Sequence, residues 1–114
     1  MPRKVKIVII YKKIKKMEKK AIYDIVINQV KELNETLPPE QQFEVNENTI
    51  LFGNGSNIDS LSLVSVIVDL ELVFSDEFGH DISLTDDRAM TRVISPFDNI
   101  TNLVDYIEEI VNEK

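Results

Sequence analysis

Three consecutive residues, Asp59, Ser60 and Leu61, are the best candidates for chemistry, because they introduce a long apolar segment, residues 61–74. If a helix begins here, its end leaves the Ser60 hydroxyl exposed, and the unpaired amides and dipole of that end favour an anion. A phosphodiester on the Ser60 oxygen would lie in this field, with the Asp59 carboxylate and an apolar contact from Leu61 beside it. The alternative is that Asp59 or Ser60 only caps the helix, and spacing alone favours that role.

The sequence offers little support for a catalytic serine. It contains one histidine, His80, and no cysteine, and Ser60 follows Asp59 rather than the Gly-x of a nucleophile elbow. Gly53 and Gly55 lack the Gly-Lys-Ser/Thr end of a phosphate-binding loop and instead predict a turn with positive φ before Ser60. We expect no metal site, and we expect His80 to be exposed or to lie beside a hinge.

Length and composition predict one small globular domain. The 114 residues are 43% hydrophobic and 29% charged, which is typical of a soluble folded protein rather than a disordered one. Because cysteine is absent, neither disulfides nor thiolate metal sites can form, and we expect a cytoplasmic protein. No apolar run approaches the roughly 20 residues that span a bilayer, so we expect no integral membrane segment.

Charge is divided unevenly along the chain. Residues 1–20 hold nine basic side chains and one acid, which gives a net charge of +8. Residues 21–114 hold four basic side chains and nineteen acids, which gives a net charge of −15. An acidic body repels nucleic acid and attracts basic protein surfaces. We therefore divide the chain into a basic N-terminal extension, 1–16, and a helical domain, 17–114. The extension could be a flexible tail or an upstream translation start, an arm on the acidic body, or an anchor for anionic lipid or nucleic acid.

Periodicity predicts a first helix over residues 18–36, which two prolines then end. Its apolar residues fall on one face at spacings of three and four: Ile22, Val26, Val30, Leu33 and Leu37. Residues 38–58 form a long connection of the kind that often has a function. The side chains expected to pin it to the core are Phe43, Val45, Ile50, Leu51 and Phe52.

A second helix is expected from Asp59 or Ser60 to about residue 77. Its β-branched residues favour a strand by propensity, and a fully buried strand is the alternative, but its polar residues recur at helical spacing. These residues are Ser62, Ser65, Asp69 and Asp76. Ten of the fourteen residues from 61 to 74 are apolar, which is more than one buried stripe requires. This helix is therefore either central in the fold or keeps apolar surface for a partner or ligand.

Two further helices complete the predicted fold. A short one is expected over residues 85–91, with Thr85 followed by two acids at its start, and a clear amphipathic one over 99–112, with Asn99 as its cap. The fold class is therefore all-α: a bundle of three main helices plus one short helix, with a long first loop.

From residue 51 to residue 107 the sequence resembles acyl carrier proteins. The matching pieces are Ile58-Asp59-Ser60-Leu61, Val64, Leu70-Glu71, Glu77-Phe78, Ile82 and residues 99–107. In that family the serine carries 4′-phosphopantetheine through a phosphodiester, and the thiol of this arm holds an acyl group as a thioester. The resemblance implies attachment at Ser60, with Asp59 and Leu61 beside it. It further implies acids that face partner enzymes, which we assign to Asp69 and Glu71. It also implies an acyl pocket, which we assign to Val64, Ile67 and Met90.

The resemblance also predicts partners. They are a phosphopantetheinyl transferase, an acyl-loading ligase or synthase, and enzymes that process the acyl group in a fatty-acid, polyketide or specialised lipid or surface-polymer pathway. The protein itself would be a monomer and not an enzyme. Ser62, Ser65 and Leu72 stand where the usual carrier has acids, which favours a specialised pathway. Two alternatives stay open: a peptidyl or aminoacyl carrier, and a helical interaction module without a prosthetic group.

Overall fold

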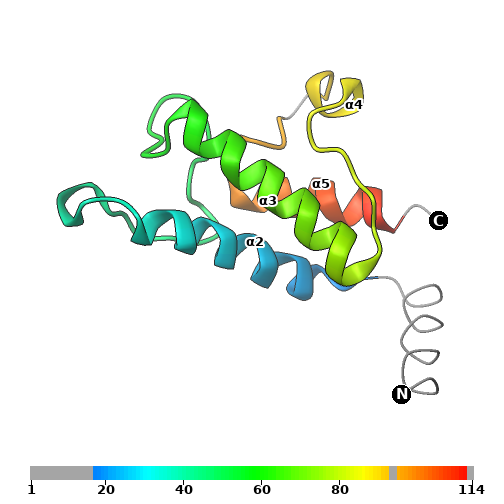
Figure 1. The fold of residues 1–114 in the computed structure, drawn as a ribbon. Helices are drawn as coiled ribbons and strands as arrows, with labels where there is room; N and C mark the ends of the chain where they lie inside the picture. Colours follow the sequence, from blue (N-terminus) through cyan, green and yellow to red (C-terminus); the bar gives the residue numbers. More distant parts are fainter. Residues whose placement is uncertain (1–16, 93–94, 113–114) are drawn as a thin grey trace, which may run out of the picture.

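The structure, a computed structural model, describes residues 17–92 and 95–112. In chain order its elements are α2 (Lys19–Glu35), the 3-10 turn η1 (Pro39–Gln41), α3 (Ser60–Phe78), α4 (Asp87–Met90) and α5 (Ile100–Val111) (Figure 1). No strand occurs within the described ranges. The predicted all-α bundle of three main helices and one short helix is thus confirmed, whereas the basic extension, 1–16, lies outside the described residues.

Helix α2 packs against both α5 and α3 and forms the centre of the bundle. The predicted face of α2 is correct, because Ile22, Val26 and Val30 are completely buried and Leu33 is partly buried. Figure 1 shows α2 and α3 running in opposite directions, so that α2 begins at the end of the bundle where α3 ends. Of the described helices, none is long and apolar enough to cross a membrane.

Helix α3 confirms the helical interpretation of the β-branched segment. Its core face consists of Leu63, Val66, Ile67, Leu70 and Phe74. Burial of this face against α2 outweighs the strand propensity of the valines and isoleucine, since propensity is a weak preference beside tertiary packing. The helix ends at Gly79, whose φ of 70° lies in the left-handed region that glycine adopts without strain.

The long connection is fixed at both sides of the bundle. The Asn34 side chain accepts a hydrogen bond from the Phe43 amide and donates one to its carbonyl (3.0 and 2.8 Å). Near the start of α5, Thr101 donates from its amide and its hydroxyl to the Glu47 carbonyl (3.0 and 2.8 Å). The loop that precedes α3 is therefore ordered by contacts with α2 and α5.

Two residues of the connection were expected in the core but lie outside it. Leu51 is completely buried, and Phe43 and Val45 pack against the core as expected. Ile50 and Phe52, however, are 37% and 56% exposed. In irregular, extended backbone, neighbouring side chains point to opposite sides, so the inward direction of Leu51 turns both neighbours outward.

The short helix α4 is shorter than predicted, because it begins at Asp87 rather than at Thr85. Asp86 is its N-cap, and the Asp86 Oδ1 accepts a hydrogen bond from the Ala89 amide at 3.2 Å. A carboxylate at this position satisfies an amide that has no partner within the helix. Helix α5 begins as predicted, with the Asn99 side chain accepting from the Asn102 amide at 2.8 Å.

Candidate functional site

The loop before Ser60 is a tight turn held by its own side chains. Gly53 and Gly55 have φ of 99° and 90°, as the sequence predicts, and a Cβ at Gly55 would come within 3.0 Å of Ile50 Cδ1. Ser56 Oγ donates to the Leu51 carbonyl (3.1 Å) and accepts from the Ile58 amide (3.0 Å). With Ile58 buried, this turn delivers the chain to the start of α3 in a fixed direction.

Asp59 is the N-cap of α3. Its Oδ1 accepts a hydrogen bond from the Ser62 amide at 2.7 Å, and its carbonyl accepts the Leu63 amide at 2.9 Å. The hydrogen bond from the Ser62 amide lowers the pKa of the Asp59 carboxyl below its ordinary value of 3.8. This side chain is therefore ionised at neutral pH and is occupied in capping the helix.

Ser60 is the first residue of α3 and is exposed. Its hydroxyl makes no hydrogen bond with any described residue, because the capping role belongs to Asp59. The sequence left open which of the two residues caps the helix, and the geometry decides between them. The result is a free hydroxyl at the positive end of a 19-residue helix.

An apolar stripe runs along α3 from the residue next to Ser60. We define the outer face of α3 as Leu61, Val64, Val68 and Leu72, which are 81%, 54%, 47% and 54% exposed, together with Asp69 and Asp76 along one edge. Residues at spacings of three and four are neighbours on a helix surface, so the four apolar side chains form one continuous stripe. Exposed apolar surface of this kind is typical of places where another molecule binds.

The two acids predicted to face partners differ in their surroundings. Asp69 is exposed on the outer face of α3. Glu71 is partly buried, and its Oε2 accepts a hydrogen bond from the Leu84 amide at 2.8 Å. Because Leu84 is completely buried, Glu71 fastens the segment after α3 to the helix, in addition to any role toward a partner.

The three residues predicted to line an acyl pocket do not come together in one interior site. Ile67 is buried in the core, whereas Val64 and Met90 are exposed. His80 follows the left-handed turn at Gly79 and is partly exposed, and its amide donates to the Phe74 carbonyl at 2.8 Å. No group of three His, Cys, Asp or Glu side chains in the described part of the chain could hold a metal ion.

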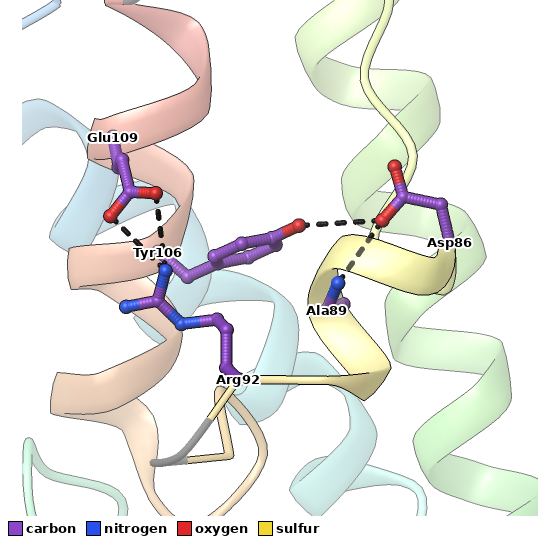
Figure 2. Close-up of polar contacts among 5 residues, drawn as sticks. All are labelled: Asp86, Ala89, Arg92, Tyr106 and Glu109. Atoms are coloured by element: carbon purple, nitrogen blue, oxygen red, sulfur yellow. Dashed lines mark hydrogen bonds and ion pairs between the residues drawn. The ribbon is translucent and has the colours of Figure 1, made fainter.

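A polar cluster that was not predicted from the sequence joins the α4 segment to α5 (Figure 2). The guanidinium of Arg92 lies 4.9 Å from the centre of the Tyr106 ring, and its Nη1 donates to both carboxylate oxygens of Glu109 at 3.1 Å. The hydroxyl of the buried Tyr106 donates to Asp86 Oδ1 over a long distance, 3.4 Å. The available signal was that Arg92 is one of two bases in the strongly acidic stretch 32–113, where such a residue commonly pairs with a carboxylate.

Comparison of the chain with models of known protein families, with curated proteins and with solved structures finds no match in any of the three.

Proposed function

We propose that this protein is an acyl carrier protein that holds acyl intermediates as thioesters on a 4′-phosphopantetheine arm attached to Ser60. The observation that supports this proposal most is the division of roles at the start of α3. Asp59 caps the helix with its carboxylate, so the exposed hydroxyl of Ser60 is left without a hydrogen bond to the described residues. A serine that served only as a cap would have its oxygen engaged by an amide.

The surroundings of Ser60 suit the covalent step. A phosphopantetheinyl transferase would join Ser60 Oγ to the β-phosphorus of coenzyme A and release 3′,5′-ADP, while the hydroxyl proton passes to a base of the transferase. The phosphodiester formed would lie at the N-terminus of α3, where free amides and the helix dipole favour an anion. The ionised Asp59 beside it offers a contact for a metal ion or a basic side chain of the transferase.

The outer face of α3 supports the second part of the proposal, the presentation of the cargo. Val64 lies one turn after Ser60 on the helix surface, so an enzyme that reaches the serine would also meet this face. Leu61 and Asp69 would supply an apolar and an anionic contact. We propose that loading and processing enzymes of a specialised pathway bind here.

The interior supports storage of cargo only in a limited way. Of the predicted acyl contacts, Ile67 alone faces the core, so a long acyl chain would have to separate packed side chains there. Burial of a chain is favourable by about 0.8 kcal/mol per methylene, which has to exceed the free energy lost from that packing. The proposal therefore favours cargo that stays near the Ser60 end of α3, in contact with Leu61 and Val64.

Intact mass spectrometry tests the attachment. The full chain is incubated with coenzyme A and a broad-specificity phosphopantetheinyl transferase, and the mass is expected to rise by one phosphopantetheinyl group. Ser60→Ala should abolish the rise. Ser65→Ala removes an exposed hydroxyl on the same helix and is the matched control, which should load like the wild type.

Circular dichroism of both variants checks that α3 is intact. Loading that persists in Ser60→Ala would place the modification elsewhere. An unchanged mass of the wild-type chain would instead favour a helical interaction module without a prosthetic group.

A further inference from the structure

The outer face of α3 has an apolar half that nothing in the described part of the molecule covers. Its four side chains follow one another at intervals of three, four and four residues, and each is about half exposed or more. The opposite side of the same helix supplies all of its buried residues, from Leu63 to Phe74. The exposed stripe is therefore surplus to the core, and its exposure in water is unfavourable unless a partner covers it.

The acidic edge of this face has no cationic partner among the described residues. Asp69 and Asp76 are exposed, and neither makes a hydrogen bond or an ion pair with a described side chain. The basic side chains with described ion pairs have partners elsewhere: Lys19 with Asp105, Lys20 with Asp24, and Arg92 with Glu109. The missing partner should therefore combine positive charge with apolar side chains.

We propose that residues 1–16 of this same chain bind to the outer face of α3. This segment has seven Lys and Arg side chains and no acid, whereas residues 17–114 hold six bases and twenty acids. Its apolar residues include Val5, Ile7, Val8, Ile9, Ile10, Tyr11 and Ile14. It therefore offers apolar side chains to the stripe and cations to the acidic edge, and the proposal does not depend on the carrier function.

Met17, the residue that follows this segment, is held at the end of the bundle where α3 finishes. The Met17 amide donates to Asn112 Oδ1 at 2.9 Å, and Asn112 Nδ2 donates to the Met17 carbonyl at 3.0 Å. Figure 1 shows that the start of α2 lies at the end of the bundle where α3 finishes. The segment would thus approach the stripe from the Leu72 end and extend toward Leu61.

The length of the segment is sufficient for this path. The eleven residue-to-residue steps from Leu72 back to Leu61 cover about 17 Å of helix axis, at 1.5 Å per step. Sixteen residues can extend over about 50 Å, so residues 1–16 can reach the entire stripe.

The covalent connection makes even a weak contact significant. A tethered segment meets its own binding site at an effective concentration in the millimolar range, so a contact with a Kd of about 1 mM would be roughly half occupied. The bound segment would cover Leu61 and Val64, which flank Ser60.

Paramagnetic relaxation in the full chain tests the proposal. The sequence has no cysteine, so Lys4→Cys gives one attachment point for a nitroxide label. We expect amide signals of residues 61–72 to lose at least half their intensity relative to the reduced label, because a rapidly exchanging contact that is half occupied broadens the nearby amides in every molecule. Amides on the exposed side of α2, at Asp24, Asn28 and Lys31, should keep theirs.

Charge and apolar variants of α3 separate the two parts of the interaction. Asp69→Lys with Asp76→Lys should abolish the intensity loss by repelling the basic segment, and Val68→Ser with Leu72→Ser should reduce it. The matched control is Glu32→Lys with Glu35→Lys on the exposed side of α2, which should leave the loss unchanged. The amide spectrum of each variant also reports whether the bundle is folded.

Three results would overturn the proposal. The first is an intensity loss that is absent from α3 or equal over the whole molecule. The second is a loss on α3 that survives Asp69→Lys with Asp76→Lys. The third is a loss that disappears on dilution of the protein, because an intramolecular contact does not depend on concentration whereas binding by a second copy of the chain does.

Discussion

Helix α5 and helix α3 have similar apolar content, but their apolar residues lie in different surroundings. In α5 the apolar residues lie on one side and are buried, among them Ile100, Leu103, Val104 and Ile107. Helix α3 buries one face in the same core and leaves a second apolar face exposed. The apolar residues of α5 are thus accounted for by folding alone. Those on the outer face of α3 are not, and they indicate binding.

Leucine-to-alanine substitutions on the two helices should show the difference between their apolar faces most clearly. Leu103→Ala removes a completely buried side chain and should lower the free energy of unfolding by about 2–5 kcal/mol. Leu72→Ala removes a side chain that is already in contact with water and should change it by less than about 1 kcal/mol. Urea unfolding followed by circular dichroism measures both values.

Leu70→Ala is the internal control, because Leu70 belongs to α3 but faces the core. It should resemble Leu103→Ala rather than Leu72→Ala. If Leu72→Ala were as destabilising as the two buried variants, the outer face of α3 would be part of the folded core, and the argument for a binding surface would fail.

A second variant examines the contact that Arg92 makes with the surface of α5. Arg92 lies over the ring of the buried Tyr106 and pairs with Glu109, so Arg92→Ala should lower the free energy of unfolding by about 1 kcal/mol. Hydrogen exchange at the Ala89 and Thr91 amides should accelerate, since the α4 segment loses its attachment to α5. The outer face of α3 has no comparable cover among the described residues.

Lys20→Ala is the control for Arg92→Ala. It breaks an exposed pair with Asp24 within α2 and should change the free energy of unfolding by less than about 0.5 kcal/mol. Equal effects of the two substitutions would show that the Tyr106 contact contributes nothing beyond an ordinary surface ion pair.

The sequence predicts the helices of this molecule well because polar residues mark their surfaces. In α3, Ser65 and Asp69 recur on one side despite many β-branched neighbours, and the observed helix agrees with the prediction to within about one residue. The cap at Asn99 is also correct, and the cap of α3 is one of the two residues that the sequence offered, since a side-chain acceptor directly before an apolar run satisfies the first free amides.

Contacts between distant segments could not be predicted in the same way. The attachment of Arg92 to Tyr106 and Glu109 depends on how the turn before α5 brings the two segments together. For the same reason Ile50 and Phe52 were wrongly placed in the core: hydrophobic character alone does not give the direction of a side chain in irregular backbone. The bond from Leu84 to Glu71 likewise requires the path of the chain after Gly79.

The smallest expected effect is a difference in pH dependence between the first turns of α3 and α5. The cap of α3 is the carboxylate of Asp59, and the cap of α5 is the amide of Asn99. The pKa of Asp59 is lowered by its bond from the Ser62 amide, so this cap contributes stability above the ordinary value of 3.8 and loses it as the pH falls through the folded-state pKa. Asn99 does not titrate, so α5 should keep its cap in acid.

The amide chemical shifts of Ser62 and Asn102 measure this difference directly in a titration below about pH 5. Ser62 should shift with a midpoint below 3.8, whereas Asn102 should stay constant until the bundle unfolds. Asp59→Asn should abolish the shift at Ser62 and keep α3 capped, because asparagine is as good a cap as aspartate. A midpoint above 3.8 would mean that the carboxylate does not bind the amide, and Ser60 would then again be a candidate for the cap of α3.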